Sequence, residues 1–198
     1  MSEHQRSIDP ETVIGDTRRW LERAVIGLNL CPFAKSVHVK GQVHYVVSPA
    51  TMPQELRQDL QQELTALHAA DPELRDTTLL IAPYCLQDFL DFNDFLAEAD
   101  AVLAELGLEG ELQIASFHPQ FQFSGTDPDD ITNFTNRAPY PTLHLLREAS
   151  IDRAVEAFPE AELIYEKNMQ TLKQLGHAGW SALDVGADGD EKKRGEPR

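Results

Sequence analysis

Hydrophobic side chains recur along much of the chain at the spacing of amphipathic helices. Leu56, Leu60, Leu64 and Leu67 follow one another at intervals of three or four residues, which places them on one face of a helix. Thr51 and Gln54 have the spacing of a capping box at its start. The same periodicity predicts further helices at about residues 10–28, 89–106, 150–158 and 159–175.

Short apolar runs rich in β-branched residues lie between these helices. They predict strands at residues 42–47, 77–82, 112–117 and 142–147. Strand–helix–strand crossovers join parallel strands with a right-handed connection, so we expect the first three strands to be parallel. The fourth strand follows a long loop and is either parallel or antiparallel beside the third. The pattern therefore predicts an α/β fold with a mainly parallel sheet of about four strands flanked by helices.

The chain is long enough to bury one core of its own. It has 198 residues, of which 41% are hydrophobic, and it contains no internal repeat. We expect a single α/β domain over residues 1–183. Residues 184–198 are mostly glycine and charged side chains, so we expect a disordered tail there.

Charge and cysteine content restrict the kinds of partner and compartment. The net charge is −16, from 33 acidic and 17 basic side chains, which disfavours binding to nucleic acid or to an anionic membrane surface. The chain has no apolar run of membrane-spanning length and no signal peptide pattern, so we expect a cytoplasmic protein. Two cysteines are too few for a disulfide framework. A small anionic ligand in one basic pocket stays compatible with this charge, and the oligomeric state stays open.

The region after the third strand carries the densest set of polar side chains. The segment 119–141 is too long for a simple connector and follows His118, the first residue after the predicted strand. Ligands of open α/β sheets bind beyond the carboxyl ends of the strands, where this loop begins. Asp, Asn and Thr also form turns and caps, so a purely structural loop is an equal alternative. The polar residues are Gln120, Gln122, Asp127, Asp129, Asp130, Asn133, Asn136, Arg137 and Tyr140.

Two sequence motifs resemble those of a known family. GLNLCPFAK at residues 27–35 and FHPQFQFSG followed by TNRAPYPTLHLLRE at residues 117–148 are similar to motifs of an uncharacterised bacterial family, classed as a domain of unknown function. The resemblance covers about residues 10–180. It implies that the two motifs belong to one unit, but it carries no established activity.

The leading hypothesis is an enzyme that acts on a small anionic metabolite. Arg137, inside the polar loop, offers paired N–H donors to a carboxylate or phosphate, and Lys35 adds a point charge. His118 is the candidate general acid or base, because imidazole titrates near neutral pH. Cys31 and His144 are candidates to assist catalysis, and the remaining ligand-binding candidates are Asn136, Tyr140 and Gln122.

Two alternatives remain open on the same residues. A zinc, iron or haem site would use Cys31, His118 and His144 with Asp130, since thiolate, imidazole and carboxylate are the usual ligands of such metals. The sequence has no HxH, HxxxH or CxxC pair, the close spacings that would support a metal site. A non-catalytic interaction module would use the polar loop as a protein-binding surface. The sequence contains no Walker A, GxGxxG or GxSxG motif, so the standard nucleotide and serine-hydrolase sites are not expected.

Overall fold

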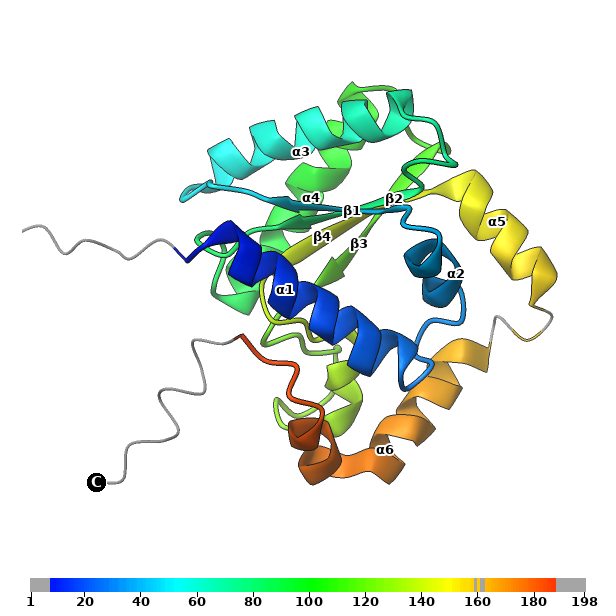
Figure 1. The fold of residues 1–198 in the computed structure, drawn as a ribbon. Coiled ribbons are helices and arrows are strands. Elements are labelled where there is room, and N and C mark those ends of the chain that lie inside the picture. The colour runs from blue at the N-terminus through cyan, green and yellow to red at the C-terminus, as the bar shows by residue number, and fades with distance from the viewer. Residues whose placement is uncertain (1–7, 159, 161–162, 188–198) are drawn as a thin grey trace, which may run out of the picture.

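A computed structural model describes residues 8–158, 160 and 163–187 of the chain. Helices and strands alternate through most of it (Figure 1). In chain order the elements are α1 (Pro10–Trp20), η1 (Leu21–Ile26), α2 (Ala34–Val39), β1 (Val43–Val47), α3 (Pro53–Ala69), β2 (Thr77–Ile81), α4 (Phe89–Glu105), β3 (Leu112–Phe117), η2 (Ile131–Asn136), β4 (Thr142–Arg147), α5 (Glu148–Ala157) and α6 (Ile164–Ala182).

The four strands form one mixed sheet in the order β1-β2-β4-β3. β1 and β2 are parallel, and β4 is antiparallel to both β2 and β3. The expected α/β fold is confirmed, and of the two orientations left open for the fourth strand beside the third, the structure has the antiparallel one. The expectation of a mainly parallel sheet is wrong, because β4 lies between β2 and β3 and separates two strands that would otherwise be parallel neighbours.

The register of β4 brings three strand ends to one edge of the sheet. Thr142, the first residue of β4, pairs with Ile81 at the end of β2 and with Phe117 at the end of β3. The carboxyl ends of the forward strands therefore meet the start of β4. The long loop between Phe117 and Thr142 begins and ends at this edge, as the sequence predicts.

Helices α3 and α4 cover one face of the sheet. The leucine stripe predicted for α3 is fully buried and packs with Phe92 of α4 against Leu143 and Leu145 of β4. Because side chains alternate along a strand, Leu143 and Leu145 share this face. All five residues of β2 are buried, as expected for a strand with neighbours on both sides and helices on both faces.

The opposite face is covered by α1, η1 and the C-terminal end of α6. Val13 of α1 packs on Leu79 and Ile81 of β2, and the Trp20 ring lies edge-on to Phe117 of β3 with 5.1 Å between ring centroids. α1 continues without a break into η1, which is wound as a π-helix. The helix predicted over residues 10–28 thus exists, and Gly15 does not interrupt it.

Several expected helix ends differ from those in the structure, and α5, for example, begins at Glu148 and not at residue 150. The capping carboxylate of α3 is Glu55, which accepts hydrogen bonds from the backbone N–H of Thr51 and of Met52, so the pairing of Thr51 with Gln54 is wrong. α6 begins at Ile164 and ends at Ala182, seven residues beyond the predicted end at 175. Its predicted start at 159 lies outside the described residues.

The end of the domain also differs from the expectation. Residues 184–187 belong to the described structure, and Val185 is buried with Trp20 and Ala24 of the first helices. The proposed boundary at residue 183 therefore falls inside the folded part. The rest of the expected tail, residues 188–198, lies outside the described residues.

Candidate functional site

Most polar side chains of the long loop are used to fold the loop itself. Asn133 is fully buried, with its Oδ1 accepting from the N–H of Phe123 and its Nδ2 donating to the carbonyl of Asp127. Asp130 caps η2 by accepting from the N–H of Thr132. The side chains of Gln122 and Asn136 donate to the carbonyls of Thr126 and Ser116. For these residues the structural interpretation of the loop is the better one.

Arg137, at the end of η2, is held in place by the loop. Its Nε donates to the carbonyl of Phe121 at 3.3 Å and its Nη2 to the carbonyl of Pro128 at 2.7 Å. The guanidinium carbon lies 4.1 Å from the centre of the Phe134 ring. Burial lowers the pKa of Arg137 from its usual value, and the nearby carboxylate of Asp129 opposes this shift. Nη1 has no hydrogen-bond partner among the described residues, which leaves its two N–H donors without a protein acceptor there.

The C-terminal end of α6 brings two more aromatic rings to Phe134. His177 and Trp180 lie edge-on to it, with ring centroids at 5.4 and 5.1 Å. They reach it because α6 is kinked at Gly176, whose φ of 65° and ψ of 176° occur almost only in glycine. The kink turns residues 177–182 onto η2.

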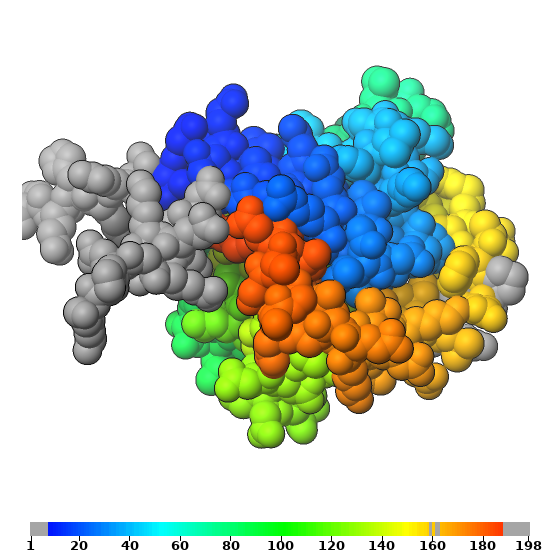
Figure 2. All heavy atoms as spheres, turned by 60° about the horizontal axis from the view of Figure 1, so that its bottom comes forward, coloured from blue at the N-terminus to red at the C-terminus, as the bar shows by residue number. Residues whose placement is uncertain are grey.

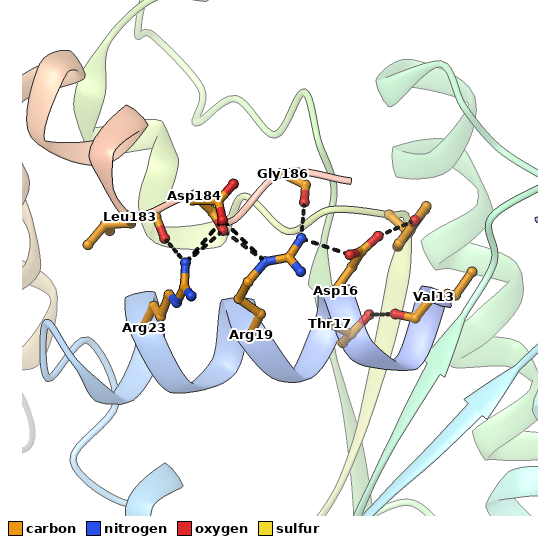
Figure 3. Close-up of polar contacts among 9 residues, drawn as sticks. Val13, Asp16, Thr17, Arg19, Arg23, Leu183, Asp184 and Gly186 are labelled. Atoms are coloured by element: carbon orange, nitrogen blue, oxygen red, sulfur yellow. Dashed lines mark hydrogen bonds and ion pairs between the residues drawn. The ribbon is translucent and has the colours of Figure 1, made fainter. Parts of the chain in front are cut away.

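Residues 183–187, here called the C-terminal strap, are anchored to the first helices by two arginines (Figure 3). Arg23 donates to the carbonyl of Leu183 at 3.0 Å and pairs with the Asp184 carboxylate at 3.1 Å. Arg19 donates to the carbonyls of Asp184 and Gly186 at 2.9 and 3.1 Å. Polar contacts on one side and burial of Val185 on the other thus fix the strap.

The buried carboxylate of Asp16 connects Arg19, which holds the C-terminal strap, to Tyr140 just before β4. Asp16 of α1 is 1% exposed, and its two oxygens meet Arg19 at 2.8 Å and the hydroxyl of Tyr140 at 2.7 Å. Tyr140 was expected to bind ligand. The structure instead places its hydroxyl on Asp16, where it joins α1 to the sheet.

A cavity of about 400 Å³ lies between the loop, the end of α6 and the strap. In Figure 2 the orange-to-red C-terminal segment runs between the blue first helices and the yellow-green loop region. Arg137 and His177 are among the lining residues, and both are close to Phe134. The lining is formed by Pro119, Phe134, Arg137, Ala138, Pro139, His177, Trp180, Ser181, Asp184, Val185, Gly186 and Ala187. We call this the Arg137 pocket.

A smaller cavity of about 250 Å³ lies between α6 and the turn after η1, next to the first sequence motif. Its only lysine or arginine among the described lining residues is Lys167, which is paired with Glu160. The Arg137 pocket is therefore the better anion site.

His118 lies on the face of the sheet that α3 and α4 cover, away from α6 and the Arg137 pocket. It is fully buried, with its ring 5.5 and 5.0 Å from the Phe89 and Phe92 rings of α4. Nδ1 accepts from the N–H of Gln120, and Nε2 must donate to the carbonyl of Leu86, since a carbonyl only accepts. Burial lowers its pKa. Both ring nitrogens are engaged, so this geometry does not favour His118 as the proton carrier of the leading hypothesis.

Cys31 and His144 lie on the α1 face, apart from His118. His144 Nε2 meets the hydroxyl of Thr77 at 2.6 Å, and burial lowers its pKa to about 4. Cys31 packs in the cluster around Trp20, and burial raises its pKa, which disfavours the nucleophilic thiolate. Lys35 is exposed on α2 and does not line the Arg137 pocket.

The candidate metal ligands are not brought together. His118 and His144 point to opposite faces of the sheet, and Asp130 caps η2. Within the described ranges, no group of three or more His, Cys, Asp or Glu side chains is placed to hold a metal ion. The donor set Cys31, His118, His144 and Asp130 therefore does not fit a single zinc or iron ion.

Sequence reasoning missed several residues in or beside the candidate site, Asp16, His177 and Trp180 among them. Asp16 had a detectable signal, because it lies on the apolar stripe of α1 between Val13 and Trp20, where an acidic residue is out of pattern. His177 and Trp180 follow the last periodic residue of α6 and had no such signal. Their position beside Phe134 depends on the kink at Gly176, which is seen only in the structure.

Fold and pocket together define an α/β protein with a four-stranded mixed sheet and an arginine-lined pocket at the carboxyl edge of its strands. The chain belongs to the family described as protein of unknown function (DUF1415), whose model matches residues 12–182. This confirms the resemblance indicated by the two motifs. Comparison with curated proteins and with solved structures finds no match. No helix in the described part of the chain is long and apolar enough to cross a membrane.

Proposed function

We propose that this protein binds a small anionic metabolite in the Arg137 pocket. The observation that supports this most is the state of Arg137, which is fixed by two backbone carbonyls and the Phe134 ring while Nη1 stays open. A guanidinium that is already oriented loses little side-chain freedom when it binds a ligand. Its remaining N–H groups suit a carboxylate or phosphate.

The pocket also has the surroundings that such a site needs. Its volume of about 400 Å³ lies within the range of small-molecule sites, about 300–1,000 Å³. Apolar and aromatic side chains form much of its wall and reduce the competition from water. On a chain of net charge −16, a ligand anion is repelled by most of the surface, so a fixed local cation has to supply the attraction.

The test is calorimetric titration of the purified chain with inorganic phosphate, succinate and benzoate. We expect at least one of them to bind the wild type. Arg137→Ala should weaken this binding by about 10- to 100-fold, the effect of losing hydrogen bonds to a charged group. Arg137→Lys should be intermediate, because it keeps the charge but loses the fork.

Arg153→Ala is the matched control, because Arg153 is exposed on α5 and bonds to Ser150. It should bind like the wild type. Absence of binding to all three anions, or equal affinity of wild type and Arg137→Ala, would contradict the proposal.

A second candidate function is catalysis on the bound anion, with His177 as the acid or base. The supporting observation is that His177 is exposed and lines the same pocket as Arg137. Imidazole is the side chain used most often for proton transfer. Incubation with a mixture of carboxylate and phosphate metabolites, followed by mass spectrometry, should show depletion by the wild type that is lost in both Arg137→Ala and His177→Ala. Depletion that survives both substitutions would exclude this role.

A further inference from the structure

We infer that the Arg137 pocket selects a monocarboxylate attached to a flat apolar ring, and that it discriminates against phosphate and other polyanions. This inference rests on the proposed function and specifies the ligand class of the same site. It follows from the charge, the wall chemistry and the size of the pocket, which point to the same kind of molecule.

The charge of the pocket matches one negative charge on the ligand. Arg137 is the only lysine or arginine among the lining residues that the structure describes. Asp184 is also a lining residue, and its carboxylate pairs with Arg23 at 3.1 Å on the α1 side. A phosphate dianion would therefore keep one charge without a lysine or arginine partner, unless His177 is protonated. A carboxylate needs only the guanidinium, which matches its two oxygens with two N–H donors.

The walls favour a flat body. Trp180 and Phe134 meet at an interplanar angle of 78°, so their rings form a corner, and the rings of Pro119 and Pro139 line the same cavity. Aromatic rings gain energy from stacked and edge-on contacts with another ring beyond the burial of apolar area. A saturated ring of the same size would bury similar area without those contacts.

The size of the cavity sets the upper limit. About 400 Å³ is near the lower end of small-molecule sites, which suits one ring or a fused pair with its carboxylate. The ring then lies toward Trp180, while the carboxylate meets Arg137.

Three probes separate these features on the unmodified protein. Benzoate carries the carboxylate and a flat ring, cyclohexanecarboxylate carries the same charge on a puckered ring, and inorganic phosphate carries more charge and no ring. Calorimetric titration should give a Kd for benzoate about 2- to 10-fold lower than for cyclohexanecarboxylate, as expected from one aromatic pair, and also lower than for phosphate. The tryptophan emission should change with benzoate and not with phosphate. Trp20 is only 2% exposed in the core, so the change is expected from Trp180 and should be lost in Trp180→Leu.

The variants use the same probes. Trp180→Leu should reduce the affinity for benzoate toward that for cyclohexanecarboxylate, with far-UV circular dichroism checked for an unchanged fold. Asp184→Asn should strengthen binding of phosphate by a few-fold, because it removes the competing carboxylate. The wild-type ranking of the three probes needs no variant, so loss of folding in Trp180→Leu leaves the test decisive.

The outcomes distinguish this inference from the proposed function. Phosphate binding as tight as benzoate, and weakened in Arg137→Ala, would leave the anion site standing and overturn the ligand class. Equal binding of benzoate and cyclohexanecarboxylate would overturn the requirement for a flat ring. Failure of every anion to bind in an Arg137-dependent way would overturn both proposals.

Discussion

His144 lies within the sheet and His118 lies at its edge. Both form hydrogen bonds to other parts of the protein through their ring nitrogens. His118 donates to Leu86 and accepts from Gln120, while His144 bonds to Thr77 across the sheet. The sequence identified both as unusual positions beside strands. It did not reveal Leu86 and Thr77 as their partners, because these residues lie 32 and 67 positions away in the chain. Long-range contacts of this kind decide whether a buried histidine is structural or catalytic.

Burial of His144 predicts that acid destabilises the fold in a defined pH window. Its pKa is about 4 in the folded chain and near 6.5 when unfolded, so the unfolded state binds more protons between these values. The free energy of unfolding should therefore fall as the pH drops from about 6.5 to 4, by at most about 3 kcal/mol from this residue. Burial lowers the pKa of His118 too, which adds a loss of the same sign.

Urea unfolding at pH 7, 6 and 5 measures this effect. His144→Gln keeps a donor for Thr77 but does not titrate, so its stability should decline less steeply with acid than that of the wild type. Carboxylates titrate in both proteins and cancel in the comparison. Identical pH slopes for the two proteins would show that His144 is not the buried neutral group described above.

The hydroxyl of Tyr140 gives a second residue-scale prediction. It donates to the buried carboxylate of Asp16, and Tyr140→Phe removes this donor without changing the ring. The loss should lower the free energy of unfolding by about 1–3 kcal/mol, the usual effect of removing a partner from a buried polar group. Tyr84→Phe is the control, since its hydroxyl bonds to Ile8 in an exposed position and should cost about 0.5 kcal/mol or less. Chemical denaturation of both variants provides the comparison, and equal costs would argue against a special role of Asp16.

Among the elements, α6 depends most on a single backbone conformation. Gly176 has a φ of 65° and a ψ of 176°, where a side chain is strained whatever space surrounds it. Gly176→Ala should cost about 1–3 kcal/mol of stability and weaken anion binding, because residues 177–182 form one wall of the Arg137 pocket. Thermal unfolding and benzoate titration measure the two effects.

Gly15→Ala is the matched control for this substitution. Gly15 is an exposed glycine inside α1 with no heavy atom within 4 Å of an added Cβ, so alanine should stabilise the chain by about 0.5–1 kcal/mol. Opposite signs for the two glycines are expected. A stabilising Gly176→Ala would mean that the kink is not imposed by glycine.

The elements themselves were largely predictable, and their pairing was not. Apolar periodicity located the leucine stripe of α3 and strands β3 and β4 to the residue, because burial imposes the same spacing on any sequence that forms these elements. The predicted end of α6 at residue 175 coincides with its kink, since the periodic face ends there. No local sequence pattern indicates that β4 lies between β2 and β3. Strand order depends on contacts between distant segments, and several orders satisfy the same pattern.

In the whole molecule, the two ends of the described chain meet beside the candidate site. Composition predicted disorder for residues 184–198, because charge and glycine outweigh apolar residues there. One buried valine and two arginines of the first helices are nevertheless enough to fix residues 184–187 (Figure 3). The carboxyl edge of the sheet was predictable as the location of the candidate site. The wall that residues 183–187 contribute to its pocket was not predictable, since it depends on the contact between the two ends of the described chain.

Arg23→Ala tests whether the strap shapes the pocket. Arg23 is half exposed and contacts Leu183 and Asp184, so its loss should reduce global stability by about 1 kcal/mol or less. Because the strap then has fewer anchors, its amides should exchange faster with deuterium, and benzoate affinity should fall several-fold. Arg57→Ala is the control, as Arg57 pairs with Glu105 on the far helices α3 and α4. Faster exchange at 183–187 without any change in affinity would separate the strap from the pocket, whereas unchanged exchange would show that Arg19 and Val185 hold the strap alone.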